Sequence, residues 1–128
     1  MKLFWTEPAI QDLRGVRDYI AADSDSDAAD FIASIITGAE RLTDFPMMGR
    51  VVPEAESEHI REILYRRYRI IYRIVGERVD VIAVIHGGRD LSSQEPKPWG
   101  YGIASASMAT RGRALPMYRL TSPDPVAH

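Results

Sequence analysis

The feature that most constrains the fold is a pair of strand-like segments joined by a turn, within residues 67–86. In the first segment Tyr and Ile alternate with Arg, a period of two that is typical of a strand with one packed face and one polar face. Gly76 and Glu77 indicate a tight turn. Residues 79–85 are almost continuously apolar, which predicts a strand buried on both faces. We therefore expect an antiparallel hairpin that ends at His86.

Two helices are predicted before this hairpin. Thr6, followed by an acid and by Pro8, has the pattern of a helix start, and apolar residues then recur at three- and four-residue spacing. An Asp- and Ser-rich turn separates this helix from a second one, expected over about 26–43. Residues 46–53 contain two prolines and a glycine, so we expect a loop there.

Short strands complete the pattern. Residues 2–6 suit a short N-terminal strand, and residues 60–65 suit a strand that precedes the hairpin. The predicted fold class is α+β: a short N-terminal strand, an α-helical hairpin and a three-stranded antiparallel β-meander, with the helices covering the apolar face of the meander.

The composition changes after Asp90, since five of the eight prolines follow it. Residues 91–128 show neither helical nor strand periodicity, so we expect one domain over residues 1–90 and an irregular, disordered or loosely packed tail over 91–128. The tail is either a dispensable extension or a segment that orders on a partner through aromatic residues such as Trp99 and Tyr101.

Several classes of function are excluded or disfavoured. The absence of cysteine excludes disulfides and thiolate zinc sites, and three scattered histidines do not suit a histidine-only metal site. The sequence has no phosphate-binding loop, dinucleotide fingerprint or Ser-His-Asp order. No apolar run approaches the roughly 20 residues that cross a bilayer. We therefore expect a cytoplasmic protein with no membrane association and no cofactor or metal.

The charge is segregated although the net charge is only −2. Residues 61–73 contain five arginines and a single acid, Glu62. Arg67, Arg69 and Arg73 fall on one face of the predicted strand, where their guanidinium groups would suit phosphate or carboxylate. The alternative is a solvated face whose arginines pair with acids such as Glu62 or Asp80.

His86, at the expected end of the last strand, is followed by Gly87-Gly88-Arg89-Asp90. A lone histidine is more often a structural hydrogen-bonding group than a catalyst, although its pKa near neutrality permits either role. Arg89 could bind an anion or pair with Asp90.

A series of short motifs, in this order, resembles the RelE/ParE family of bacterial toxins over about residues 3–90. The motifs are Ala9 with Asp12-Leu13, Tyr19-Ile20, Ala28-Ala29-x-Phe31-Ile32, Leu42-x-x-Phe45-Pro46-x-x-Gly49-Arg50, Arg61-Glu62, Tyr68-Arg69-Ile70-Ile71-Tyr72 and Val84-x-His86-Gly87-x-Arg89-Asp90. The fold that this resemblance implies agrees with the order of elements predicted above.

The resemblance implies the toxin of a type II toxin-antitoxin system, which inhibits bacterial growth. The Gly49-Arg50 loop and the His-Gly-x-Arg-Asp ending are more similar to the ParE-like branch, which inhibits DNA gyrase by binding and needs no catalytic group. The residues then expected to contact target or antitoxin are Arg50, Arg67, Arg69, Tyr72, Arg73, His86 and Arg89.

Two alternatives remain open. A RelE-like, ribosome-dependent mRNA endoribonuclease would use Arg61, Arg69, His86 and Arg89 as catalytic residues, although this chain has Gly87-Gly88 where such nucleases carry a terminal His or Tyr. A decayed toxin would only bind its antitoxin.

Every branch implies a cognate antitoxin that wraps the toxin. Acidic residues of that partner are expected to neutralise the arginine face and to quicken association. We expect a hetero-oligomer of 1:1 protomers.

Overall fold

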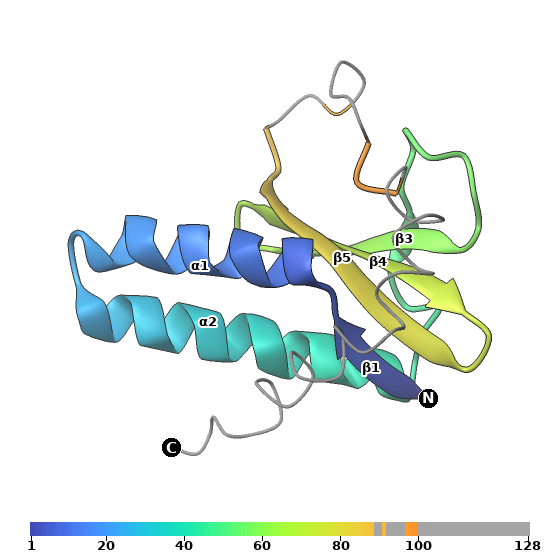
Figure 1. Cartoon of the computed structure of the whole chain (residues 1–128), viewed down its shortest axis with the longest axis horizontal. Helices are drawn as coiled ribbons and strands as arrows, with labels where there is room; N and C mark the ends of the chain where they lie inside the picture. The colour runs from blue at the N-terminus through green and yellow to red at the C-terminus, as the bar shows by residue number, and fades with distance from the viewer. Residues whose placement is uncertain (89–90, 92–96, 100–128) are drawn as a thin grey trace.

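The computed structural model describes residues 1–88, 91 and 97–99. The elements follow one another along the chain (Figure 1) as β1 (Lys2–Trp5), α1 (Glu7–Ala21), α2 (Asp25–Glu40), the 3-10 helix η1 (Arg41–Thr43), β2 (Arg50–Val51), β3 (Ile60–Tyr65), β4 (Tyr68–Val75) and β5 (Arg78–His86). The predicted α+β class, with a short N-terminal strand, a helical hairpin and a three-stranded meander, is confirmed.

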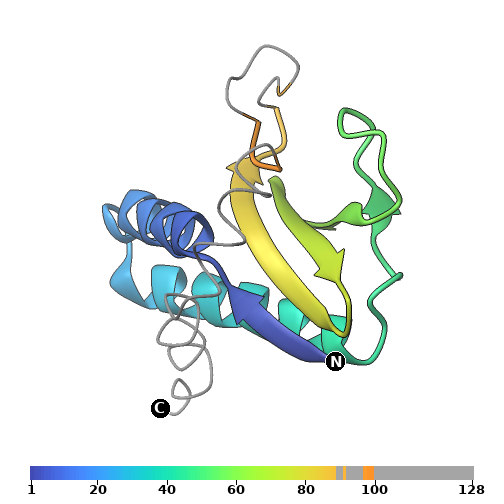
Figure 2. The ribbon, with the colours of Figure 1, turned by 45° about the vertical axis from the view of Figure 1, so that its right-hand side comes forward.

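All strands belong to one sheet, in the order β1-β5-β4-β3-β2. β3, β4 and β5 form the antiparallel meander, while β1 pairs in parallel with β5 at one edge. Figure 2 shows the two helices lying side by side against one face of this sheet. The segment predicted as a loop contains β2, which pairs with β3 at the other edge because the side chain of Arg50 is anchored on Glu62. α2 is shorter than predicted, since its last turn tightens into η1.

The start of α1 is tied directly to the sheet. The Thr6 hydroxyl accepts a hydrogen bond from the Ala9 amide at 3.4 Å and donates one to the Val81 carbonyl at 2.9 Å. It therefore caps the helix and joins it to β5. In contrast, the cap of α2, Ser24, bonds the Asp27 amide at the surface. In the part of the chain that the structure describes, no helix is long and apolar enough to cross a membrane.

The main core lies between the helices and the sheet. Trp5 and Ala39 are fully buried there, and Tyr72 and Val81 pack with them from β4 and β5. The predicted apolar stripe of α1 is confirmed, since Ile10, Leu13 and Val16 are buried. Phe31 and other half-buried residues of α2 complete this cluster.

β5 buries both of its faces, and a β-bulge interrupts its ladder with β4. Ala83 lies opposite Ile71, but Val81 lies opposite Tyr72, so Ile82 is an extra residue in the ladder. Val81 faces the helices, whereas Ile82 and Ala83 both join a second apolar cluster on the far face. The prediction of a strand buried on both faces is confirmed, because β5 contributes residues to the main core on one face and to the second cluster on the other.

Residues from the loop before β3 and from beyond β5 cover the second cluster. Val52 and Leu91 are fully buried in it, and Ala55 and Trp99 pack against it. Leu91 and Trp99 thus contact the domain although they follow the expected boundary after Asp90. Asp90 itself and most of the expected tail over 91–128 lie outside the described residues.

We predict that Thr6→Val lowers the free energy of unfolding by about 1–2 kcal/mol, because a buried cap that also bonds the sheet is lost. Ser24→Ala, the matched change at the solvent-exposed cap of α2, should cost about 0.5–1 kcal/mol. Urea denaturation of both variants measures the difference. Equal losses would show that the bond from Thr6 to Val81 contributes nothing beyond capping.

Candidate functional site

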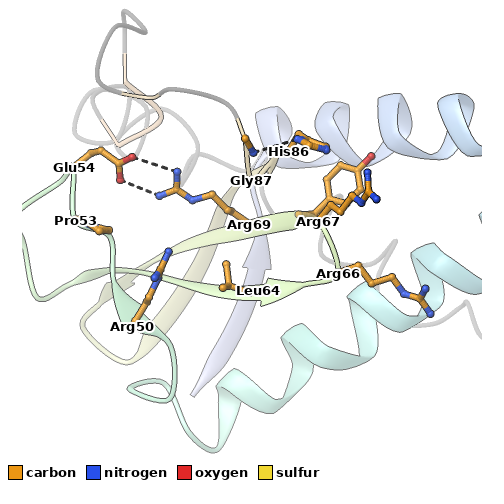
Figure 3. Close-up of a pocket in the computed structure, with 11 residues that line it drawn as sticks. Arg50, Pro53, Glu54, Leu64, Arg66, Arg67, Arg69, His86 and Gly87 are labelled. Carbon is orange, nitrogen blue, oxygen red and sulfur yellow. Dashed lines mark hydrogen bonds and ion pairs between the residues drawn. The ribbon is translucent and has the colours of Figure 1, made fainter.

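An open pocket of about 370 Å³ lies where β5 ends and where β3 turns into β4 (Figure 3). Five basic residues line it, and the single acid among its lining residues is Glu54. The basic residues are Arg50, Arg66, Arg67, Arg69 and His86. Four of these were predicted from the sequence as binding residues, and the fold brings them together from three separate segments of the chain.

A network of ion pairs forms the wall of this pocket. The carboxylate of Glu62 is fully buried and accepts hydrogen bonds from Arg50 Nε and Arg69 Nε, each at 2.6 Å. Arg69 also donates from Nη1 and Nη2 to Glu54, at 3.3 and 2.9 Å, in a bidentate pair. The side chain of Arg69 is only 7% exposed, whereas that of Arg50 is 59% exposed. Arg69 therefore links the sheet to the loop that carries Glu54.

Of the two interpretations of the arginine face, the open face of Arg67, Arg69 and Arg73 is not what the structure contains. Arg69 is held by its two glutamates, and Arg73 lies opposite Asp80 on β5, with its Nη2 3.5 Å from that carboxylate. Arg67 belongs to the turn between β3 and β4 and not to the strand. The alternative interpretation, pairing with Glu62 and Asp80, describes Arg69 and Arg73, because acids on neighbouring strands neutralise guanidinium groups that would otherwise be buried as unpaired charges.

The ion pair with Arg69 controls the ionisation of Glu54. Hydrogen bonding from the Arg69 guanidinium lowers the pKa of Glu54 below its ordinary value, although partial burial acts in the opposite direction. Glu54 is therefore a charged carboxylate at neutral pH, and it covers the outer donors of Arg69.

Tyr72 is completely buried, so it is not the surface contact that the sequence suggested. Its hydroxyl donates to the Pro46 carbonyl at 2.6 Å and accepts from the Gly49 amide at 3.0 Å. A Cβ atom on Gly49 would lie 2.7 Å from that hydroxyl oxygen, so this position needs glycine. Burial raises the pKa of Tyr72, which keeps the hydroxyl protonated as a donor.

Arg61, a candidate of the nuclease alternative, also supports this loop and does not line the pocket. It donates to the carbonyls of Glu58 and Gly49, each at 2.8 Å. Tyr72 and Arg61 together hold residues 46–49 against the sheet.

The loop that Tyr72 and Arg61 hold in place exposes apolar side chains, which were not predicted from the sequence. Phe45, Met47 and Met48 are 63%, 55% and 47% exposed. A run of such residues is typical of an interaction surface, because soluble domains seldom leave large apolar groups together in water. The signal in the sequence was an apolar Phe-Pro-Met-Met run with neither helical nor strand periodicity.

The remaining basic residues of the pocket differ in the contacts that their side chains make. Arg66 turns away from the pocket and lies over the ring of Tyr65, 5.4 Å from its centroid (Figure 3). The His86 ring packs edge-on against Tyr68, and its Nδ1 accepts a hydrogen bond from the Gly88 amide at 3.2 Å. The guanidinium of Arg67 has no ion-pair partner among residues 1–88, 91 and 97–99.

Arg89, the last predicted site residue, lies outside the described residues. Within the described ranges, no cluster of three or more His, Cys, Asp or Glu side chains is arranged to hold a metal ion. The pocket of the described structure is thus built from guanidinium, imidazole and carboxylate groups, a set that suits anion recognition.

Comparisons with known proteins agree with this fold. Residues 3–91 match the family described as "ParE toxin of type II toxin-antitoxin system, parDE". The chain is also similar to a solved structure described as "Chromosomal ParDE TA system from P. aeruginosa", with a TM-score of 0.58 and 22% sequence identity, covering 67% of this chain and 95% of that one. At this identity the likeness shows the shared fold alone. No curated protein matches the sequence.

We predict that the Glu54 ion pair stabilises the fold at neutral pH and not in acid. Because the pKa of Glu54 is lowered in the folded state, its contribution is present above the ordinary value of 4.5 and is lost as the pH falls through the folded value. The stability advantage of the wild type over Glu54→Gln, measured by urea denaturation, should shrink between about pH 6 and about pH 3. Glu56→Gln, on the same loop, should show no such trend; an advantage over Glu54→Gln that stays constant with pH would contradict the assignment.

Proposed function

We propose that this chain, which belongs to the ParE toxin family of type II toxin-antitoxin systems, arrests bacterial growth by binding DNA gyrase and is neutralised by a cognate antitoxin. We favour binding over catalysis because the hydrogen-bond donors of the Arg69 guanidinium are already engaged. Its Nε, Nη1 and Nη2 atoms all donate to glutamates of the same chain.

A phosphodiester-cleaving site needs cations aimed at the scissile phosphate and groups placed to move protons. Arg69 is the natural candidate for the phosphate, but Glu54 and Glu62 occupy its donors. Arg61 is engaged by backbone carbonyls of its own domain. These contacts support a surface that recognises a protein, where buried arginines position loops and need not touch the target.

The exposed loop residues Phe45, Met47 and Met48 supply the apolar part of such a surface. Arg50 follows this loop in the sequence. Its guanidinium adds a half-exposed positive charge that is paired with the buried carboxylate of Glu62. Methionine side chains adapt to the shape of a partner at low cost, and Phe contributes a large buried area on contact. We assign this loop to the antitoxin, whose acidic side chains would complement the neighbouring arginines.

Two features favour the alternative, a ribosome-dependent mRNA endoribonuclease. Arg67 and His86 are both exposed at the pocket, and the His86 ring can present its Nε2 because Nδ1 is used by the Gly88 amide. These groups could contact a phosphate without Arg69. The two functions differ in target, so they separate in purified systems.

We predict that the purified chain inhibits DNA supercoiling by gyrase in a dose-dependent manner and leaves mRNA intact in a reconstituted translation reaction. Adding the antitoxin at a 1:1 ratio should restore supercoiling. Cleavage of ribosome-bound mRNA with normal supercoiling would establish the nuclease instead. A chain that binds the antitoxin but inhibits neither process would be a decayed toxin.

We further predict that the double change Phe45→Ser and Met47→Ser weakens antitoxin binding at least about tenfold, because apolar contact area is lost. The fold should be kept, since both side chains are more than half exposed. Tyr19→Ser removes an aromatic group that is 77% exposed on α1 and serves as the matched control. Calorimetric titration measures all three affinities; an equal loss in the Tyr19 variant, or none in the double variant, would exclude this loop as the contact.

A further inference from the structure

The two glutamates on Arg69 differ in how firmly they are held. Glu62 lies on β3, is fully buried and is shared with Arg50, so its bond to Arg69 Nε is a fixed part of the sheet. Glu54 lies on the loop between β2 and β3, and its side chain is 26% exposed. Figure 3 shows the carboxylate of Glu54 meeting the two outer nitrogens of Arg69. The inner contact of Arg69 is therefore buried, whereas water reaches the outer one.

The loop between β2 and β3 is anchored at both ends, by the buried Val52 and by the bonds of Glu58 and His59 to the sheet, and Glu54 lies between these anchors. The Ala55 amide bonds the Val52 carbonyl at 3.1 Å, and the Ala55 side chain packs against the second apolar cluster. Glu56 adopts a φ of 53°, in the left-handed region, which costs a non-glycine residue about 1 kcal/mol. The ion pair of Glu54 therefore adds to these anchors, and the backbone at Glu56 is strained in this conformation.

The rest of the pocket offers contacts that Glu54 does not use. Arg67 has no ion-pair partner within the described part of the chain. Leu64 is 58% exposed on the pocket wall, beside the half-buried Tyr68. A ligand that carries a carboxylate would reproduce the contact of Glu54 with Arg69, and it would gain a second arginine and an apolar wall.

We propose that this pocket receives an acidic side chain from the antitoxin, and that Glu54 is an internal substitute which the partner's carboxylate displaces from Arg69. This inference rests on the proposed pairing with an antitoxin. The exchange replaces one carboxylate by another, so the charge around Arg69 and Glu62 stays balanced while Glu54 passes into water. The recognised segment is extended and carries an Asp or Glu beside a small apolar residue. This is the order of Glu54 and Ala55 in the loop between β2 and β3.

A carboxylate fits this site better than a phosphate. Arg69 carries a single positive charge that Glu62 already neutralises in part, and Glu62 cannot leave because it is buried. A dianion at the outer donors would lie close to that fixed negative charge, and like charges at short distance repel. The apolar wall from Leu64 and Tyr68 also suits a peptide more than a polyanion.

The first test compares the affinities of two variants for the antitoxin. Glu54→Gln keeps the shape of the side chain but removes its charge, so the outer donors of Arg69 become available and the dissociation constant should fall about tenfold. Glu56→Gln changes the neighbouring glutamate, which does not contact Arg69, and should leave the affinity unchanged. An affinity of Glu54→Gln equal to or below that of the wild type would overturn the exchange.

The second test uses a defined probe and needs no antitoxin. The Glu54→Gln protein is titrated with an amidated Val-Pro-Glu-Ala peptide, which copies residues 52–55, with the same peptide carrying Gln in place of Glu, and with inorganic phosphate. Binding of the Glu peptide alone supports the proposal. Equal binding of both peptides, or binding of phosphate in preference to the Glu peptide, would overturn it.

The two tests distinguish a failure of the proposed antitoxin pairing from a failure of the proposed displacement of Glu54. If no antitoxin binds the wild-type or the variant protein, the proposed pairing fails, and the peptide titration alone decides whether the pocket accepts a carboxylate. If the antitoxin binds both proteins equally, the pairing stands and the displacement of Glu54 fails.

Discussion

The architecture around the site depends on one buried carboxylate. Glu62 is wholly removed from water, and a carboxylate in that environment must be paired and hydrogen bonded. Arg50 and Arg69 satisfy it from either side, so the edge strand β2 is attached to β3 and the side chain of Arg69 is drawn into the sheet. The remaining donors of Arg69 then fix the loop of Glu54. One charge thus determines the position of an edge strand, a buried arginine and a loop, and it shapes the wall of the pocket.

The fold could be predicted from the sequence because the spacing of the apolar residues agreed with the residues that begin and end helices and strands. Alternation in β4, the apolar run of β5 and the Thr6 cap each indicated the element that the structure contains. The parallel pairing of β1 with β5 could not be predicted, since a short apolar strand carries no information about its partner. The two-residue strand β2 was missed because its pairing depends on the distant Glu62 and not on local propensity.

The site was predicted less completely than the fold. The clustering of arginines along the sequence correctly indicated a basic site. The alternation of a strand shows which side chains share a face, but it does not show which acids on neighbouring strands neutralise them. Tyr72 was taken for a contact residue, yet its hydroxyl is used inside the domain to hold Pro46 and Gly49. Residues that expose apolar groups, such as Met47, were overlooked because loop residues have no periodicity to mark them. The surface that emerges combines a rigid apolar loop with a basic pocket, and both features suit protein recognition.

We propose that this chain acts by binding gyrase and not by cleaving RNA. Pulse labelling of DNA and protein synthesis in a bacterial host, after the chain is induced without an antitoxin, tests that claim most directly. We expect DNA synthesis to fall first, together with a DNA-damage response, while protein synthesis continues. An early fall in protein synthesis with continued DNA synthesis would contradict it.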